Sequence, residues 1–461
     1  MWSRWSQHVR PYLFTLLLLS FIATVASGET AWIKYIEGIL ALLSFVLSFH
    51  AARRMFQIVG SIFITAGIAC LLWAHVPLQK LPLLLTSNVM LISLLYMLPF
   101  VNHAIRVGGY DRHLSRWLQV KGGRLDTLFV RSLIVSYCLS LFLFFAALPL
   151  MKRVLGKYLA DVEESTAKRF MASSILPGFG IVAVWSPVEP LVATAVLLTG
   201  VSYAKLFPWM FAFSLVLLAL GSLRGLAYRQ KGALETAAAL GSSYETRPTH
   251  APSWSHTFQF FIALAILIGS AFLAHSIVSV SFFTAMTLIL LPFSILWAVM
   301  KRRFNRFVKI SRKKWQENTD GLRHLLVLFL SFGFFNAAIA QTPLFTWLSG
   351  PVQAISAWPV LLYICIAVLF LVLPVLGLHP LVVMSVIGLF LPPVLEVISP
   401  LSIAVVMIIC SLASAFMGTF NSTVTIMSGL LQVNPYRITL WNLVFGVVFA
   451  VVGVIAGLLL L

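Results

Sequence analysis

ASSILPGFGIVAVWSPVEPLVAT, residues 172–194, is the stretch from which the rest of the chain can be interpreted. It is largely apolar, yet it contains Pro177 and Gly178 and, further on, Glu189 between two more prolines. Proline and glycine interrupt helices, and ionisable groups at membrane depth are rare and usually functional. The stretch therefore predicts a broken membrane helix with a carboxylate close to its break.

The composition places this break inside a membrane protein. Of the 461 residues, 60% are hydrophobic and only 10% are charged, too few charges to cover a soluble protein of this size. Apolar runs long enough to cross a bilayer recur along the chain and are continuous rather than alternating, which excludes a β-barrel. We predict an all-α polytopic membrane protein with about 11–13 membrane segments, including broken helices and re-entrant hairpins. The candidate segments are 11–28, 32–49, 55–75, 81–103, 126–150, 171–200, 204–227, 255–275, 278–300, 323–341, 357–377, 380–398, 402–432 and 437–461.

The net charge of +19 fits membrane topology better than nucleic-acid binding. Lysine and arginine gather in short connections between apolar runs, as the positive-inside rule describes, and we expect the connections 104–125, 228–254 and 301–322 to face the cytoplasm. Anionic membrane lipids are the natural partner of such loops. No nucleic acid is expected, because that would need a basic face with exposed aromatic side chains.

The N-terminus leaves two alternatives. Arg4 and Arg10 precede the apolar run 13–26, which ends in Ala-Ser-Gly as a secretory signal does. Because another apolar run follows almost at once, we favour a retained first span with its N-terminus inside, and a cleaved signal stays open.

A weak internal repeat divides the chain. The stretches 201–213 and 433–445 align without gaps, with Trp209 opposite Trp441, and Trp117-Leu118 matches Trp347-Leu348 at a nearly equal interval. The loop before Trp117 is rich in arginine, whereas its counterpart has no lysine or arginine, so equivalent loops are expected on opposite sides. This pattern predicts two inverted-topology repeats, the arrangement of many transporters. The predicted regions are N-terminal spans at 1–54, a first transport repeat at 55–227, a cytoplasmic linker at 228–254 and a second transport repeat at 255–461.

The second repeat contains a counterpart of the opening stretch, SLASAFMGTFNSTVTIMSG, residues 411–429. Broken backbone at membrane depth must be buried in protein or line a cavity, and half-helix ends near the midplane bind anions and cations. Two dense clusters at matching places favour a binding site over tight helix packing by small residues. The predicted substrate and ion site consists of Ser173, Ser174, Gly178, Ser186, Glu189, Gly418, Thr419, Asn421, Ser422 and Thr423.

Other acids and motifs carry less weight. Glu189 has an alternative interpretation at a helix end, with its carboxylate reaching the headgroups, and Glu37 and Glu396 are expected to be interfacial. The GFGIVA sequence at 178–183 fits a dinucleotide fingerprint but has no preceding strand. The four cysteines show no paired spacing, so no catalytic residue, metal site or cofactor is expected. No Walker motif is present, so ATP hydrolysis by this chain is not expected.

At these residues the chain resembles the ion transporter superfamily, which includes divalent anion/sodium symporters, arsenite permeases and citrate permeases. In each half an apolar segment with a late proline, LFLFFAALPL at 141–150 and LFLVLPVLGLHP at 369–380, precedes a broken helix and a final Trp-bearing helix. The resemblance implies inverted repeats, two re-entrant hairpins at 126–150 and 357–380, and a substrate site where hairpins meet broken helices. The Ser-Asn-Thr motifs of sodium-coupled members are permuted here to Asn421-Ser422-Thr423.

These observations favour a secondary active transporter, a permease of the cytoplasmic membrane that moves a small anion by alternating access. A sodium ion or a proton is the expected coupling ion. The alternative is a lipid or polyprenyl-phosphate translocase of the cell envelope that uses the same cavity opened sideways. A membrane enzyme is disfavoured because no His/Asp/Glu cluster is present. A monomer and a homodimer are both left open.

Overall fold

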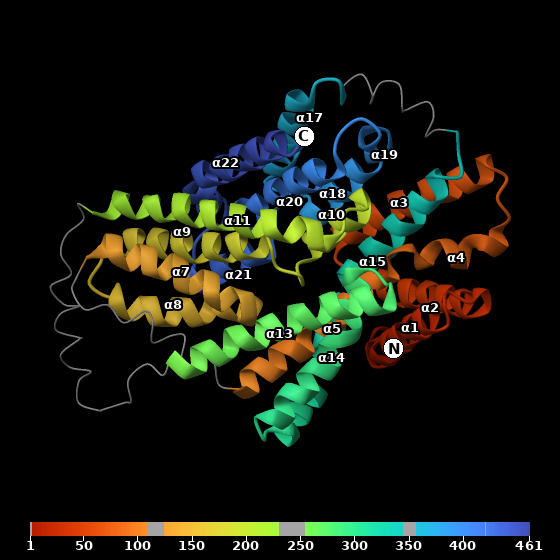
Figure 1. The fold of residues 1–461 in the computed structure, drawn as a ribbon, viewed down its shortest axis with the longest axis horizontal. Coiled ribbons are helices and arrows are strands. Elements are labelled where there is room, and N and C mark those ends of the chain that lie inside the picture. The colour runs from red at the N-terminus through yellow and green to blue at the C-terminus, as the bar shows by residue number, and fades with distance from the viewer. Residues whose placement is uncertain (1, 109–123, 230–253, 344–355, 420) are drawn as a thin grey trace. The chain divides into compact units, whose positions relative to one another are not determined.

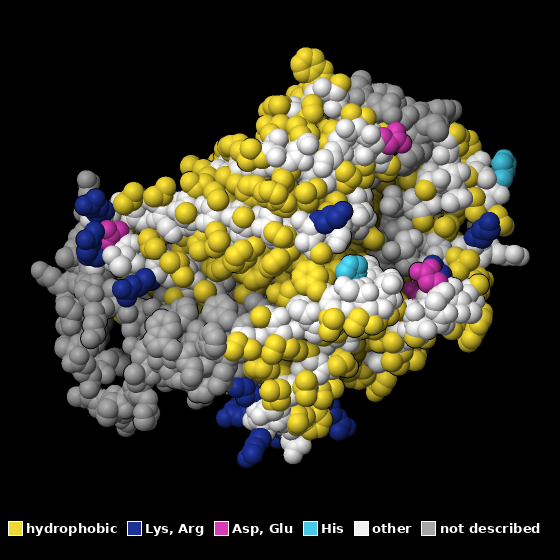
Figure 2. All heavy atoms as spheres, in the orientation of Figure 1, with side chains coloured by type: hydrophobic (Ala, Val, Ile, Leu, Met, Phe, Trp, Pro, Cys, Tyr) yellow, Lys and Arg dark blue, Asp and Glu magenta, His cyan; other side chains and the backbone are white. Residues whose placement is uncertain are grey.

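The structure, a computed structural model, describes residues 2–108, 124–229, 254–343, 356–419 and 421–461, and every regular element in these ranges is a helix (Figure 1). Within them, nine helices are long and apolar enough to cross a membrane by length and composition. Hydrophobic side chains cover much of the exposed helix surface (Figure 2). The predicted all-α polytopic membrane protein is confirmed. Most of the predicted linker and the Trp117/Trp347 match lie outside the described residues.

The chain folds into two compact units, each made of segments that are distant in sequence. The first unit comprises Met1–Gly108, Leu267–Ala354 and Gly388–Val394, and the second comprises Gly109–Ile266, Ile355–Ile387 and Leu395–Leu461. These units do not coincide with the four regions expected from the sequence, because the first unit takes part of both predicted repeats. The repeat boundaries stay a prediction.

The first unit is built on one long helix, α15, which packs against α1, α2, α3 and α5. At about 1.5 Å per residue, its 36 residues extend roughly 54 Å, well beyond the roughly 30 Å of bilayer hydrocarbon. Its first half is polar and its second half is apolar, so only the second half suits the hydrocarbon. The elements are α1 (Trp2–Ala26), α2 (Ala31–Phe49), α3 (Arg54–Trp73), η1 (Leu78–Lys80), α4 (Leu81–Leu85), η2 (Thr86–Asn88), α5 (Val89–Gly108), α14 (Phe282–Met300) and α15 (Phe304–Ile339). Helices α13 (Trp254–Val278) and α19 (Leu391–Leu395) are divided between the two units.

The second unit contains both predicted broken helices. Its elements are α7 (Leu125–Leu143), η4 (Phe144–Ala146), α8 (Ala147–Tyr158), α9 (Glu164–Ala183), α10 (Pro190–Thr199), α11 (Tyr203–Leu223), η5 (Arg224–Tyr228), α17 (Pro359–Val372), α18 (Pro380–Gly388, of which Gly388 belongs to the first unit), α20 (Pro400–Met417), α21 (Ser422–Leu431) and α22 (Pro435–Leu459). Helices α7, α9 and α11 lie side by side (Figure 1), and α17, α20 and α22 pack against one another in the same way.

Both regions where hairpins were expected, 126–150 and 357–380, contain a turn. Helix α7 ends at Leu143, the next residue, Phe144, has a backbone φ of 50°, and α8 returns to pack against α7. In the second region α17 ends at Val372, and Gly377, with φ 111°, lies before α18. A φ of this value suits glycine because it has no Cβ. That these turns are re-entrant in a bilayer stays a prediction.

The structure adds detail to two sequence-based expectations, whose positions relative to the bilayer stay predictions. Residues 304–322, expected to be part of a connection, form the first half of α15, because a helix can continue out of the membrane when its side chains become polar. Glu37, expected at the interface, is 3% exposed and its Oε2 accepts a hydrogen bond of 2.5 Å from the Thr24 hydroxyl. Packing of α2 against α1 buries Glu37, which the position of an acid along an apolar run does not reveal.

Candidate functional site

The break between α9 and α10 is buried and only partly satisfied by hydrogen bonds. The Trp185 carbonyl accepts a hydrogen bond of 2.5 Å from the Tyr203 hydroxyl, and the Trp185 indole donates one of 2.7 Å to Tyr137 Oη. Ser186 is 3% exposed, and its hydroxyl has no hydrogen-bond partner among the described residues. Tyr203 therefore holds the backbone of the break and Tyr137 holds the Trp185 side chain, while the buried Ser186 hydroxyl has no partner among the described residues.

Glu189 closes this first break as the N-cap residue of α10. It is 8% exposed, makes no side-chain capping hydrogen bond and forms no ion pair within the described residues. Burying a charge without an opposite charge beside it is costly, although the N-terminal end of α10, with the Leu191 N–H directed at the carboxylate, partly favours it. Because it is buried in protein, its side chain does not match the alternative in which it reaches the headgroups.

The break between α20 and α21 is closed by its own side chains. The Gly418 N–H donates a hydrogen bond of 2.8 Å to the Ser414 carbonyl, and a Cβ on Gly418 would lie 2.7 Å from that oxygen. Thr419 is fully buried, and its hydroxyl lies 3.0 Å from that of Thr439 on α22. The Thr423 hydroxyl donates to the Ala415 carbonyl, which the break has freed.

Asn421 is the N-cap residue of α21, and its side-chain oxygen accepts a hydrogen bond of 3.3 Å from the Thr423 N–H. This is the usual capping interaction of asparagine at a helix start. Ser422, the first residue of α21, is exposed. The second break therefore presents amide and hydroxyl groups and no acid.

The two broken helices share one register. Glu189 and Asn421, Gly200 and Gln432, and Tyr203 and Pro435 occupy equivalent positions as N-cap, left-handed C-cap and first residue of the next helix, each pair 232 positions apart. The half-helices α10 and α21 each have ten residues. The interval equals that between Trp209 and Trp441, so the sequence match extends to the local backbone.

The two breaks also pack against each other. Helix α9 contacts α20, α10 contacts α20, and α21 contacts α9, so each half-helix packs on the long helix of the other half. Gly180 makes the close approach of α9 to α20, since a Cβ there would lie 2.6 Å from the Phe416 ring. The two predicted clusters, 173–189 and 418–423, thus belong to helices that are in contact within one unit.

Three of the predicted residues lie in the interior of α9 rather than at its break. Ser174 is fully buried and its hydroxyl donates to the Phe170 carbonyl at 2.9 Å. Gly178 faces α7, where a Cβ would lie 2.8 Å from the Leu133 carbonyl oxygen, so only glycine allows this approach. Ser173 is ten residues before the end of α9, roughly 15 Å along the helix axis. Proline 177 did not end the helix as the sequence suggested.

Arg224, which the sequence analysis did not single out, connects Ser173 to the final helix. Pro177 has no N–H, so the Ser173 carbonyl lacks its usual helical donor, and Arg224 Nη1 donates to that oxygen at 3.2 Å. Arg224 Nη2 lies 3.2 Å from the Trp441 carbonyl oxygen and 3.2 Å from Asn442 Oδ1. The guanidinium forms no ion pair with a carboxylate in the described part of the chain.

This arginine stands close to the second break. Asn442, its partner, lies one helical turn from Thr439 on the same face of α22, about 4.5 Å along the axis, and Thr439 contacts Thr419 inside the break. A partly buried cation, a helix N-terminus and several hydroxyls are therefore grouped around the second break, whereas the first break contains an acid. A proline four residues after Ser173 was the only sequence signal for this arrangement.

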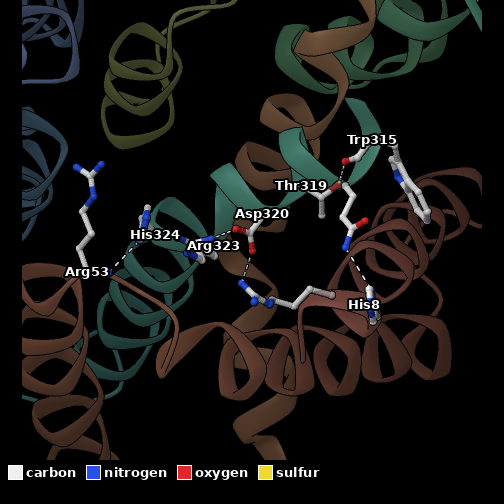
Figure 3. A network of polar contacts seen from close by, with 9 residues as sticks. His8, Arg53, Trp315, Thr319, Asp320, Arg323 and His324 are labelled. Carbon is white, nitrogen blue, oxygen red and sulfur yellow. Dashed lines mark hydrogen bonds and ion pairs between the residues drawn. The ribbon is translucent and has the colours of Figure 1, made fainter. Parts of the chain in front are cut away.

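A separate polar network lies in the first unit (Figure 3). Arg10, which is 2% exposed, donates from Nη1 to Asp320 Oδ1 at 2.6 Å, and Arg323 pairs with the other oxygen of Asp320. The Arg53 N–H donates to His324 Nδ1 at 3.0 Å. These contacts tie α1 and the start of α3 to α15, and each buried charge has an opposite charge beside it. In the described part of the chain, no group of His, Cys, Asp and Glu residues could hold a metal ion.

No family model and no curated protein matches the chain. Among solved structures the chain is similar to the YdaH transporter of Alcanivorax borkumensis, a transporter described as having an unusual topology. The two are 14% identical, with a TM-score of 0.61 over 87% of this chain and 98% of that chain. At this identity the similarity shows the fold: the chain is a multi-pass membrane protein with a transporter-like fold.

Proposed function

We propose that this protein is a secondary active transporter of the cytoplasmic membrane that moves a small anion by alternating access, coupled to a proton or sodium gradient. The observation that carries the proposal is the pair of broken helices in equal register, each half-helix packed on the long helix of the other half. Such pairs form the central sites of transporters with inverted repeats. The resemblance to the ion transporter superfamily supports the same function.

The two breaks differ in chemistry, which suggests that one binds the substrate and the other binds the coupling ion. At the second break Asn421, Ser422 and the first N–H groups of α21 offer donors, and Arg224 adds a positive charge nearby. Donors at a helix N-terminus together with a guanidinium suit a carboxylate or an inorganic oxyanion. We place the anionic substrate there.

At the first break the equivalent position is Glu189, whose carboxylate would repel an anion. A buried carboxylate suits a proton or a sodium ion, and the same break contains an unpartnered buried hydroxyl three residues earlier, that of Ser186. We place the coupling ion there. The interlocked packing of α9, α10, α20 and α21 gives a physical route by which occupation of one break affects the other.

Reconstitution into liposomes tests this function. Purified protein is inserted into vesicles with an imposed pH or sodium gradient, and uptake of a panel of carboxylates and inorganic oxyanions is measured. We expect gradient-dependent uptake of at least one anion, abolished by collapsing the gradient. Absence of uptake for the whole panel, together with movement of fluorescent lipid between the leaflets, would contradict the proposal and favour a lipid translocase.

A further inference from the structure

The turn between α14 and α15, together with the first turns of α15, concentrates the positive charge of the chain. Residues 301–316 contain eight lysines and arginines and no acid, a quarter of the 32 in the whole protein. They begin directly after Met300, the last residue of the apolar helix α14. In Figure 2 dark-blue side chains gather beside hydrophobic ones at this end of α14. Charge of one sign and apolar surface therefore meet along a sharp boundary.

One face of the first three turns of α15 presents a shallow, open groove behind this boundary. A groove of about 470 Å³ is lined by Phe304, Asn305, Val308, Lys309, Arg312 and Lys313. The spacing of these residues places them along one face of the helix. A neighbouring groove of about 410 Å³ shares Phe304 and Asn305 and adds Arg302, Arg303 and Arg306. Lys309, Arg312 and Lys313 form no ion pair with any described acid.

Apolar side chains stand exposed on both sides of the charge. On the last turns of α14, Leu296 is 60%, Val299 51% and Met300 66% exposed, and on α15 Phe304 is 40% and Val308 42% exposed. A partner that satisfies both surfaces needs a negative group for the groove and an apolar part that can lie along α14. Free phosphate lacks the apolar part.

We infer that this groove binds the headgroup of an anionic phospholipid, with its acyl chains along the exposed side of α14. The groove starts where the candidate membrane span Phe282–Met300 ends, which is the level at which headgroups lie. Basic side chains just outside a membrane helix attract anionic lipid, each by a small amount. The site is distinct from the broken helices, so lipid binding does not depend on the transport proposal.

The experiment uses the full chain, purified in detergent, and phosphatidylglycerol as the probe. Native mass spectrometry measures how many phosphatidylglycerol and phosphatidylcholine molecules stay bound as lipid is titrated. We expect one or two phosphatidylglycerol molecules to bind in preference to phosphatidylcholine, and salt to weaken them. In the triple variant Lys309→Gln, Arg312→Gln, Lys313→Gln the affinity for phosphatidylglycerol should fall roughly a hundredfold.

A matched control removes the same charge elsewhere. Lys80→Gln, Arg153→Gln, Lys205→Gln neutralises three exposed cations outside the groove and should leave the tightly bound phosphatidylglycerol in place. All six side chains are on the surface, so both variants should elute and melt like the parent protein. The inference is overturned if the two lipids bind equally, if the control loses as much affinity as the groove variant, or if inorganic phosphate displaces the lipid at equal concentration.

Discussion

The Asp320 network of the first unit and the broken helices of the second unit treat their charges in opposite ways. In the first unit Arg10 and Arg323 share Asp320, so the charges of these three residues are paired. In the second unit Glu189 and Arg224 form no ion pair within the described residues, although Glu189 is 8% exposed. The two regions also differ in solvent access, since the side chains of Asp320 and Arg323 are 31% and 25% exposed.

Paired and unpaired charges have different uses. A buried ion pair fixes the positions of the helices that carry it, and breaking it leaves an uncompensated charge. An unpaired buried charge costs stability and is retained where it has a task, such as binding a substrate or an ion. The comparison therefore assigns a structural role to the network of Figure 3 and a functional role to Glu189 and Arg224.

Glu189→Gln should have the largest effect on transport. The amide keeps the size of the side chain but can neither release a proton nor neutralise a sodium ion, so gradient-driven uptake should fall to background. Because it removes an unpaired buried charge, thermal stability should stay the same or rise. Uptake in proteoliposomes and the thermal midpoint in detergent are measured together. Parent-like uptake and ion dependence would mean that the carboxylate has no part in coupling.

Asp320→Asn should have the opposite pair of effects: a loss of stability without a loss of coupled transport. Arg10 would lose its ion pair with Asp320, and we expect a loss of about 2–3 kcal/mol in the free energy of unfolding. Uptake per folded molecule should keep its gradient dependence. The control is Glu164→Gln, which breaks the exposed Glu164–Lys168 pair and should change the melting temperature little. Loss of coupling in Asp320→Asn at unchanged stability would break the comparison.

Much of the fold could be predicted because apolar runs and helix breakers are local signals. The predicted segments 32–49 and 55–75 match α2 and α3 within two residues at each end, and the breaks near Glu189 and Asn421 were placed correctly. The position of Glu37 could not be predicted, because its burial depends on α1, whose packing no local pattern records. The interior of α9 was misjudged for a similar reason: Arg224, 47 positions beyond Pro177, satisfies the carbonyl that this proline leaves free.

Arg224→Gln tests whether Arg224 binds the anion or only donates hydrogen bonds to the protein. Removing a charged hydrogen-bond donor from a bound anion costs about 1.5–3 kcal/mol, so the KM for the anion should rise by roughly 10- to 100-fold. Arg224→Lys keeps the charge but cannot span the Ser173 and Asn442 oxygens at once, and should give an intermediate KM. If both variants lower the thermal midpoint while KM stays unchanged, Arg224 only donates hydrogen bonds within the protein. Its role would then be structural, like that of Arg10 and Arg323.

Asn421 permits the smallest but most selective change, because it occupies the position of Glu189 in the other half. Asn421→Ala removes the cap of α21 and should cost about 1 kcal/mol of stability. Asn421→Asp restores a good cap, so stability should return to that of the parent protein, but it places at the second break the same negative charge that Glu189 provides at the first. If the anion binds there, the KM of Asn421→Asp should rise about tenfold while that of Asn421→Ala changes less. Initial rates of uptake across anion concentrations, with thermal midpoints for each variant, measure both effects. An unchanged KM in Asn421→Asp would place the substrate away from the second break and would leave the asymmetry between the two N-caps without a role in anion recognition.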